Sequence, residues 1–147
     1  MAGVRVGLAF ASTEIIDLMN RVKPPYNVSG IAQQAVIDAL ESDSAVRDWV
    51  KSTITERSSL ERSLASFDIV QRVYPSDTNF LLVKVDNADA IYRYLISEKI
   101  VVRNRNNVEL CEGCLRITIG TRKEKKRLLT ALTEFDERTG LSTAISR

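Results

Sequence analysis

Two arginines, Arg103 and Arg116, have the residue type and spacing that could perform binding chemistry. They lie in IVVRN and LRITIG, two segments whose alternating apolar residues predict strands. If the strands pair as a hairpin, one register sets the arginines opposite each other. Like charges across a ladder destabilise it, so this register indicates an anion between them, and a planar guanidinium suits a carboxylate or a phosphate. The alternative, that both side chains point into solvent and stay apart, remains open.

The histidine, cysteine and basic residue content limits which catalytic, metal-binding and nucleic-acid-binding functions are possible. The sequence has no histidine, which removes imidazole as a general base and as a metal ligand. Cys111 and Cys114 form a C-x-x-C pattern that could supply half a zinc site or a dithiol. No second pair accompanies them, so thiols that pack in the core are favoured and no metal is expected. The basic run at 122–127 lacks interleaved aromatic residues, which favours a solvated helix face over a nucleic-acid surface.

Composition sets the class of molecule. The chain has 147 residues, 44% hydrophobic and 27% charged, with a net charge of +2. It can therefore bury a core, and its charge indicates neither a nucleic-acid nor a membrane partner. Two cysteines without a secretion signal favour the cytoplasm, and no stretch approaches the roughly 18 apolar residues of a membrane span.

The pattern from Asn79 onward predicts the elements that position the arginines: strand, helix, strand, strand, helix. This order is typical of an α+β module in which antiparallel strands lie under helices. Upstream, residues 44–67 predict one long connecting helix, and residues 5–11 predict a strand. Thr121 and Glu124 form a capping box before the last helix. The expected organisation is a remnant of a larger domain at 1–43, the connecting helix at 44–67, a small α/β domain at 68–135, and a disordered tail at 136–147.

Five ordered blocks of sequence resemble one enzyme family. They are AGVRVG at 2–7, VKPPYNVS at 22–29, PSDTNF at 75–80, IVVR at 100–103 and CLRITIGT at 114–121. Together they resemble the C-terminal part of histidinol-phosphate aminotransferase, a pyridoxal-phosphate enzyme of the aspartate aminotransferase fold. The resemblance covers residues 2–135. It implies the small C-terminal domain of a fold-type I aminotransferase, with the strand at 5–11 left over from the large domain.

The resemblance also implies roles for three arginines. Arg5 would hold the cofactor phosphate. Arg116 would bind the carboxylate of glutamate or the phosphate of histidinol phosphate, and Arg103 would assist at the same anion. The family's Schiff-base lysine falls just before Met1, and no lysine of this chain can be matched to it, so no catalytic residue is expected here. A fragment that is inactive alone follows from that mismatch, because the covalent chemistry depends on the amine.

The implied reaction moves an amino group between histidinol phosphate and 2-oxoglutarate in histidine biosynthesis, and the implied parent enzyme is a homodimer. Two alternatives remain. One is another fold-type I aminotransferase with a phosphate- or carboxylate-bearing substrate. The other is a non-catalytic βαββα module that binds an anionic metabolite through the same arginines.

Overall fold

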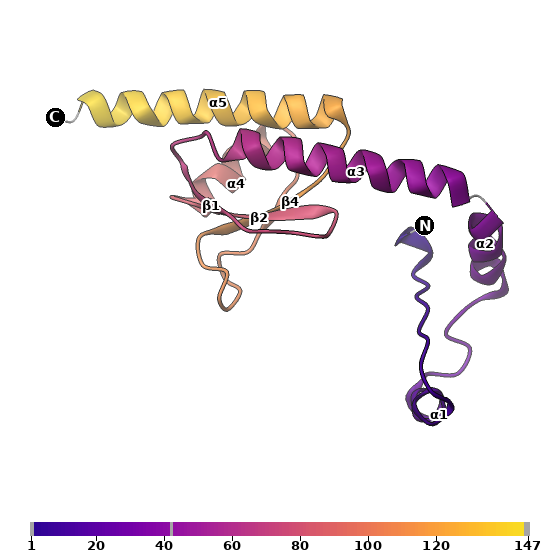
Figure 1. Ribbon diagram of the computed structural model, residues 1–147. Coiled ribbons are helices and arrows are strands. Elements are labelled where there is room, and N and C mark those ends of the chain that lie inside the picture. The colour runs from indigo at the N-terminus through magenta and orange to yellow at the C-terminus, as the bar shows by residue number, and fades with distance from the viewer. Residues whose placement is uncertain (1, 42, 146–147) are drawn as a thin grey trace. The chain divides into compact units, whose positions relative to one another are not determined.

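The computed structural model describes residues 2–41 and 43–145, and these divide into two compact units, Met1–Asp48 and Trp49–Arg147. Figure 1 shows the elements along the chain. The boundary falls inside the long helix α3 (Asp43–Leu64), the element that the sequence predicts as a connector over 44–67.

The first unit contains a short 3₁₀ turn (Ala2–Val4), α1 (Thr13–Val22), α2 (Gly30–Glu41) and the start of α3. The strand predicted over 5–11 is wrong, because the structure assigns no strand to this segment. A strand needs a neighbour to accept and donate its ladder hydrogen bonds, and no described segment pairs with this one. Residues 5–11 therefore have the sequence pattern of a strand but no neighbouring strand to pair with among the described residues.

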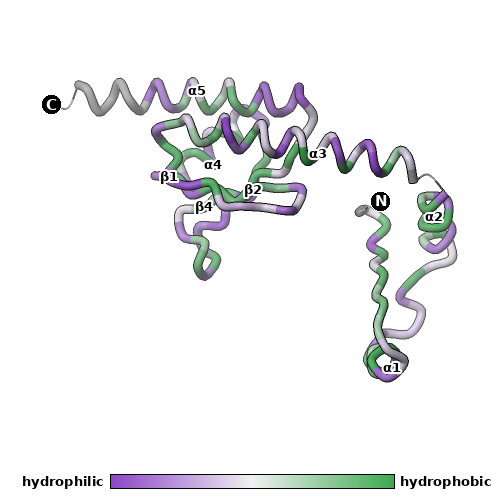
Figure 2. The backbone as a smooth tube through the Cα atoms, viewed as in Figure 1, coloured by the Kyte–Doolittle hydropathy of each residue, from purple (hydrophilic) through white to green (hydrophobic). Residues whose placement is uncertain are grey.

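Helix α1 has an apolar stripe without a partner. Ile15, Leu18, Met19 and Val22 recur at helical spacing and all four are exposed. In Figure 2, part of the α1 tube has the green colour of hydrophobic residues. No side chain of α1 or α2 is buried. The described part of the first unit therefore has no core of its own.

The second unit is built on a four-stranded sheet. Its strands are β1 (Val70–Val73), β2 (Phe80–Val85), β3 (Arg103–Asn104) and β4 (Cys114–Thr118), in the order β1-β2-β4-β3, and all neighbours are antiparallel. Helices α4 (Ala88–Ser97) and α5 (Arg122–Ile145), together with the C-terminal half of α3, pack on this sheet (Figure 1).

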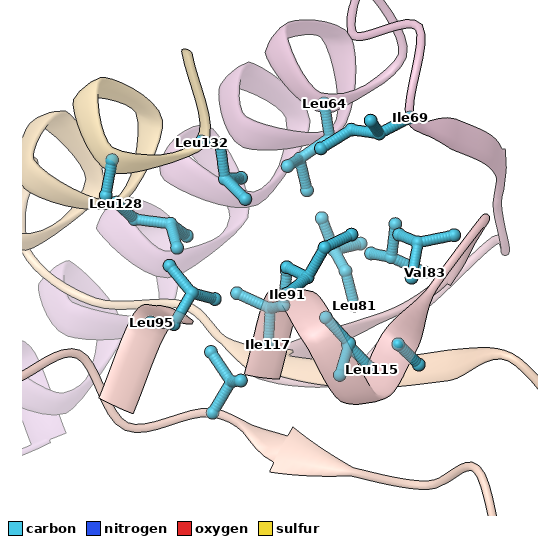
Figure 3. Packing of buried hydrophobic residues seen from close by; sticks show 14 of the residues in the cluster. Leu64, Ile69, Leu81, Val83, Ile91, Leu95, Leu115, Ile117, Leu128 and Leu132 are labelled. Carbon is cyan, nitrogen blue, oxygen red and sulfur yellow. The ribbon is translucent and has the colours of Figure 1, made fainter. Parts of the chain in front are cut away.

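Alternate residues of the sheet form the core. In β2, Leu81 and Val83 are buried, whereas Phe80, Leu82 and Lys84 are only partly buried. The buried strand residues meet helix residues in one cluster, which Figure 3 shows from close by. The helix side of this cluster comes from Leu60, Leu64, Ile91, Leu95, Leu128 and Leu132. The helices thus cover one face of the sheet, and the other face carries the partly buried side chains.

The predicted order from Asn79 onward is confirmed, and two lengths differ. The segment IVVRN forms only a two-residue strand, because β3 lies at the edge of the sheet and pairs with β4 alone. Helix α5 continues to Ile145, where the sequence predicts a tail from residue 136. The stretch 136–145 contains no proline and a single glycine, so nothing in it ends a helix sharply.

A buried carboxylate joins α3 to α5. Glu56 accepts a hydrogen bond from Lys125 Nζ at 2.5 Å and one from Arg122 Nε at 2.8 Å. These two bonds, with the charges of Lys125 and Arg122, lower the pKa of Glu56 below its usual 4.5. The predicted capping box is also present. Glu124 Oε2 accepts from Thr121 N at 2.7 Å, and Thr121 Oγ1 accepts from Glu124 N at 3.3 Å. Both features set where α5 begins relative to the sheet.

We expect Glu56→Gln to lower the Tm of the chain by a few degrees at neutral pH, because Lys125 and Arg122 lose their carboxylate. The lowered pKa means that the stabilisation is present above pH 4.5 and disappears as the pH falls through the folded-state value. The Tm difference between the variant and the native chain should therefore shrink on acidification. Glu61→Gln on the same helix is the control. A Tm difference that persists at low pH would contradict this account.

Candidate anion-binding site

Arg103 and Arg116 lie directly opposite each other across the β3–β4 ladder. The sequence left two arrangements open, and the structure has the one in which the arginines are opposite each other. Leu82 of β2 pairs with Arg116 on the other side, so one row of the sheet contains Arg103, Arg116 and Leu82. Leu82 is only partly buried and its neighbours Leu81 and Val83 are in the core. The row therefore lies on the face of the sheet opposite the helices.

The guanidinium of Arg116 is fixed over an aromatic ring but is not fully hydrogen-bonded. Its Cζ lies 5.0 Å from the centroid of Phe80, which places a cation over the ring face. Its Nε is buried and has no hydrogen-bond partner. A buried donor without an acceptor costs free energy, and such groups in native structures call for a partner. An oxygen of a bound anion would supply that acceptor.

The surrounding sheet face is positively charged. Arg72 pairs with Lys84 across the β1–β2 ladder. Lys84 lies two residues from Leu82 in β2 and therefore on the same face. Arg72 and Lys84 thus share the sheet face of Arg103 and Arg116. None of these four cations forms an ion pair within the described part of the chain. Arg72 instead lies 4.9 Å from the ring centroid of Tyr74. Because none of the four is held in an intramolecular ion pair, their charge can act on an external anion.

The basic run at the start of α5 serves intramolecular contacts. Arg122 and Lys125 bind Glu56, and Arg127 donates to the carbonyl oxygen of Glu98 at 2.5 Å. These cations hold α5 against α3 and the end of α4. Apart from Lys125, which is partly buried, the cations of the run are exposed, as the predicted solvated helix face requires.

The two cysteines are free thiols. Cys114 is buried at the start of β4, as the packing interpretation predicts, and its N–H donates to the carbonyl oxygen of Cys111 at 2.9 Å. Burial is the largest of the effects that raise the pKa of Cys114. Among residues 2–41 and 43–145, no group of three or more metal-ligating side chains is found. No helix in the same ranges is long and apolar enough to cross a membrane.

Arg5 belongs to the first unit, in the segment before α1. Its side chain is exposed and has no ion-pair partner among the described residues. Its backbone φ is 60°, a conformation that is uncommon for a residue with a Cβ. Its assignment to a cofactor phosphate stays a prediction.

Sequence reasoning missed the part that Phe80 plays beside Arg116. The signal was present in the alternation of β2, which puts Phe80 on the same face as Leu82. It also missed the side-chain hydrogen bonds of Asp89 to Asn104 and Asn106, beside β3. Their contacts join a helix to a loop, and no local pattern in the sequence encodes them.

A family model for aminotransferases of class I and II matches residues 1–132. The chain belongs to the class I and II aminotransferase family. Membership implies that the parent enzyme depends on pyridoxal phosphate. It agrees with the resemblance drawn from the five sequence blocks, and the match extends from the first unit to the end of the core of the second.

Curated relatives of this chain include histidinol-phosphate aminotransferases. The histidinol-phosphate aminotransferase of Parabacteroides distasonis is 50% identical over 131 residues, and that of Flavobacterium psychrophilum is 46% identical over 132 residues. These matches cover 89% and 90% of this chain but 38% of each relative. The chain therefore spans somewhat more than a third of the length of the relatives that it matches.

Solved structures show the same fold. A putative aminotransferase from Burkholderia pseudomallei superposes with a TM-score of 0.75 at 30% identity, covering 86% of this chain and 38% of that one. The histidinol-phosphate aminotransferase from Clostridium acetobutylicum superposes with a TM-score of 0.76 at 24% identity, covering 85% of this chain and 38% of that one. The small α+β architecture is thus that of an aminotransferase domain.

The environment of the two cysteines predicts different reactivity. We expect iodoacetamide to modify Cys111 of the native chain well before Cys114, because Cys114 is buried and its raised pKa keeps it protonated. Mass spectrometry of peptides after timed labelling checks the order. Denatured chain is the control, in which both thiols should react at similar rates. Equal rates in the native chain would show that Cys114 is accessible.

Proposed function

We propose that this chain is the C-terminal part of a histidinol-phosphate aminotransferase, in which Arg116 and Arg103 bind the anionic end of the substrates. The names and identities of the curated relatives support the assignment of the family. The observation that carries the role of the arginines is their direct pairing across β3 and β4, together with the buried, unpartnered Nε of Arg116.

One pair of guanidiniums suits both halves of the proposed reaction. Histidinol phosphate presents a phosphate, and glutamate or 2-oxoglutarate presents a carboxylate. A planar guanidinium can donate two parallel N–H hydrogen bonds to either group, which a lysine ammonium cannot do. The Phe80 ring beneath Arg116 limits the directions in which its guanidinium can turn. The residues of this chain therefore bind and orient the substrate's negative end.

Pyridoxal phosphate would supply the electron sink for moving the amino group. From this chain, Arg5 would hold the cofactor phosphate, and its exposed guanidinium without an ion-pair partner fits that role. No lysine of this chain matches the Schiff-base position of the family. The 147-residue chain alone would therefore not transaminate, and its retention of the cofactor is not expected. We also propose that the parent enzyme is a homodimer in the cytoplasm.

The two alternatives make different demands on binding. A different fold-type I aminotransferase would use the same arginines for another anionic substrate. A non-catalytic anion-binding module would bind its metabolite tightly and selectively as an isolated chain. An aminotransferase fragment should instead bind phosphate monoesters and glutamate weakly and with little preference, since only the anion contacts are provided by these residues.

We expect Arg116→Ala to weaken the binding of a phosphate monoester about tenfold or more, because a charge-assisted bidentate contact is lost. Arg116→Lys should recover only part of the affinity. Titration followed by NMR chemical shifts of the full chain measures both. Arg62→Ala, which removes the same charge from α3, is the matched control. Equal affinity of the Arg116 and Arg62 variants would exclude the proposed site.

The missing lysine predicts the outcome of cofactor trapping. After incubation of the chain with pyridoxal phosphate and reduction with borohydride, peptide mass spectrometry should find sparse labelling spread over several surface lysines. Stoichiometric labelling of one lysine would contradict the proposal that the covalent residue lies outside this chain. Acetylated chain, whose lysines cannot react, gives the background.

A further inference from the structure

We propose that Asp89 is a positioning residue that holds the edge strand carrying Arg103 against Arg116, an inference that rests on the proposed anion site. Asp89 lies in the first turn of α4, on the helix layer, and touches neither arginine through an ion pair. Its influence reaches the site through Asn104, which directly follows Arg103 in the chain, and Asn106, two residues further on.

The edge strand needs such a support. β3 contains two residues and pairs only with β4, and Arg103 is exposed. Two guanidiniums directly opposite each other repel, which opposes the pairing of the strands that carry them. Beyond the ladder, the backbone adds one bond at this point, from Arg105 N to Cys114 O at 2.9 Å. A short strand with a repulsive pair depends on contacts outside the ladder.

The carboxylate of Asp89 provides two of them. Its Oδ1 accepts from Asn104 Nδ2 at 2.5 Å, and its Oδ2 accepts from Asn106 Nδ2 at 3.0 Å. The helix that carries it is firmly set. Asn87 caps α4 by accepting from Ala90 N at 3.0 Å, and Ile91 and Leu95 of α4 are buried in the core. Asp89 thus ties the segment after Arg103 to a rigid element.

Asn106 extends the network to the strand that carries Arg116. Its Oδ1 accepts from Gly113 N at 2.8 Å, and the carbonyl oxygen of Gly113 accepts from Val85 N at 2.9 Å. Gly113 precedes β4 and has a φ of 73°, which glycine adopts readily. The network therefore fixes both the end of β3 and the beginning of β4. The loop between these strands appears in orange below the sheet in Figure 1.

Both amides are locked in orientation by backbone donors. Asn104 Oδ1 accepts from Asn106 N at 2.9 Å, and Asn106 Oδ1 accepts from Gly113 N. Turning either amide over would point its NH₂ group at a backbone N–H. Each amide must therefore present its NH₂ group to residue 89, and only a carboxylate accepts both. An asparagine at residue 89 would set one NH₂ against another.

The same hydrogen-bond geometry allows a second substitution to restore the bonds that Asp89→Asn loses. In the double variant Asp89→Asn with Asn106→Asp, the new amide at 89 accepts from Asn104 and donates to the new carboxylate at 106. That carboxylate still accepts from Gly113 N. All the hydrogen bonds are restored, and the net charge equals that of the native chain. Asp86→Asn is the matched control, because Asp86 lies just before α4, three residues from Asp89, but accepts from Gln71 of β1 at the opposite edge of the sheet.

The experiment is a titration of the full chain and these variants with inorganic phosphate, followed through the Arg116 side-chain NMR signals. Asp89→Asn should bind phosphate about fivefold more weakly, the double variant within about twofold of native, and Asp86→Asn as native. Charge alone predicts the opposite sign, since removing a carboxylate near a cationic face should strengthen anion binding.

Each outcome has a meaning. Native or tighter binding by Asp89→Asn overturns the positioning role, and so does a double variant as weak as the single one. If Asp89→Asn fails to fold, restored binding in the double variant still supports the role. Failure of the native chain to bind phosphate at Arg116 refutes the proposed site itself, which separates the two claims.

Discussion

The opposition of two guanidiniums across neighbouring strands is the constraint on which the second unit depends. Arg103 and Arg116 occupy one row of an open sheet face, and neither forms an ion pair within the described residues. Such an arrangement is unfavourable by itself. A sheet that keeps it must hold the strands together by other means and gains when an anion lies between the charges. The packed helices provide the first condition, and the unpartnered Arg116 Nε points to the second.

The rest of the unit holds that row in place. One face of the sheet is sealed by α3, α4 and α5, whose leucines and isoleucines meet the inward residues of β2 and β4 (Figure 3). Glu56 fixes α5 to α3, and Asp89 joins α4 to the segment after Arg103. Because the core lies on one side only, the other side keeps its row of cations at the surface. Because one face of the sheet forms the core and the other carries the cations, a small domain can present a binding site.

Period-two patterns in the sequence indicate which residues share a face, and one of the arrangements that they left open sets the two arginines opposite each other. The alternation in LRITIG separates Leu115 and Ile117 from Arg116, whereas the long loop over 105–113 leaves the register of the two strands open. Long-range contacts were beyond such reasoning. The bonds of Asp89 to Asn104 and Asn106 join residues 15 and 17 positions apart, and the cation–π contact needs the β2–β4 register. The segment 5–11 failed for a related reason, since a pattern of strand residues forms a strand only beside another strand.

The most direct test of the account is a structure of this chain with a phosphate monoester bound. The account predicts phosphate density between Arg103 and Arg116, with one oxygen accepting the hydrogen bond from Arg116 Nε. Density elsewhere on the chain, with the two guanidiniums directed into separate regions, would contradict it.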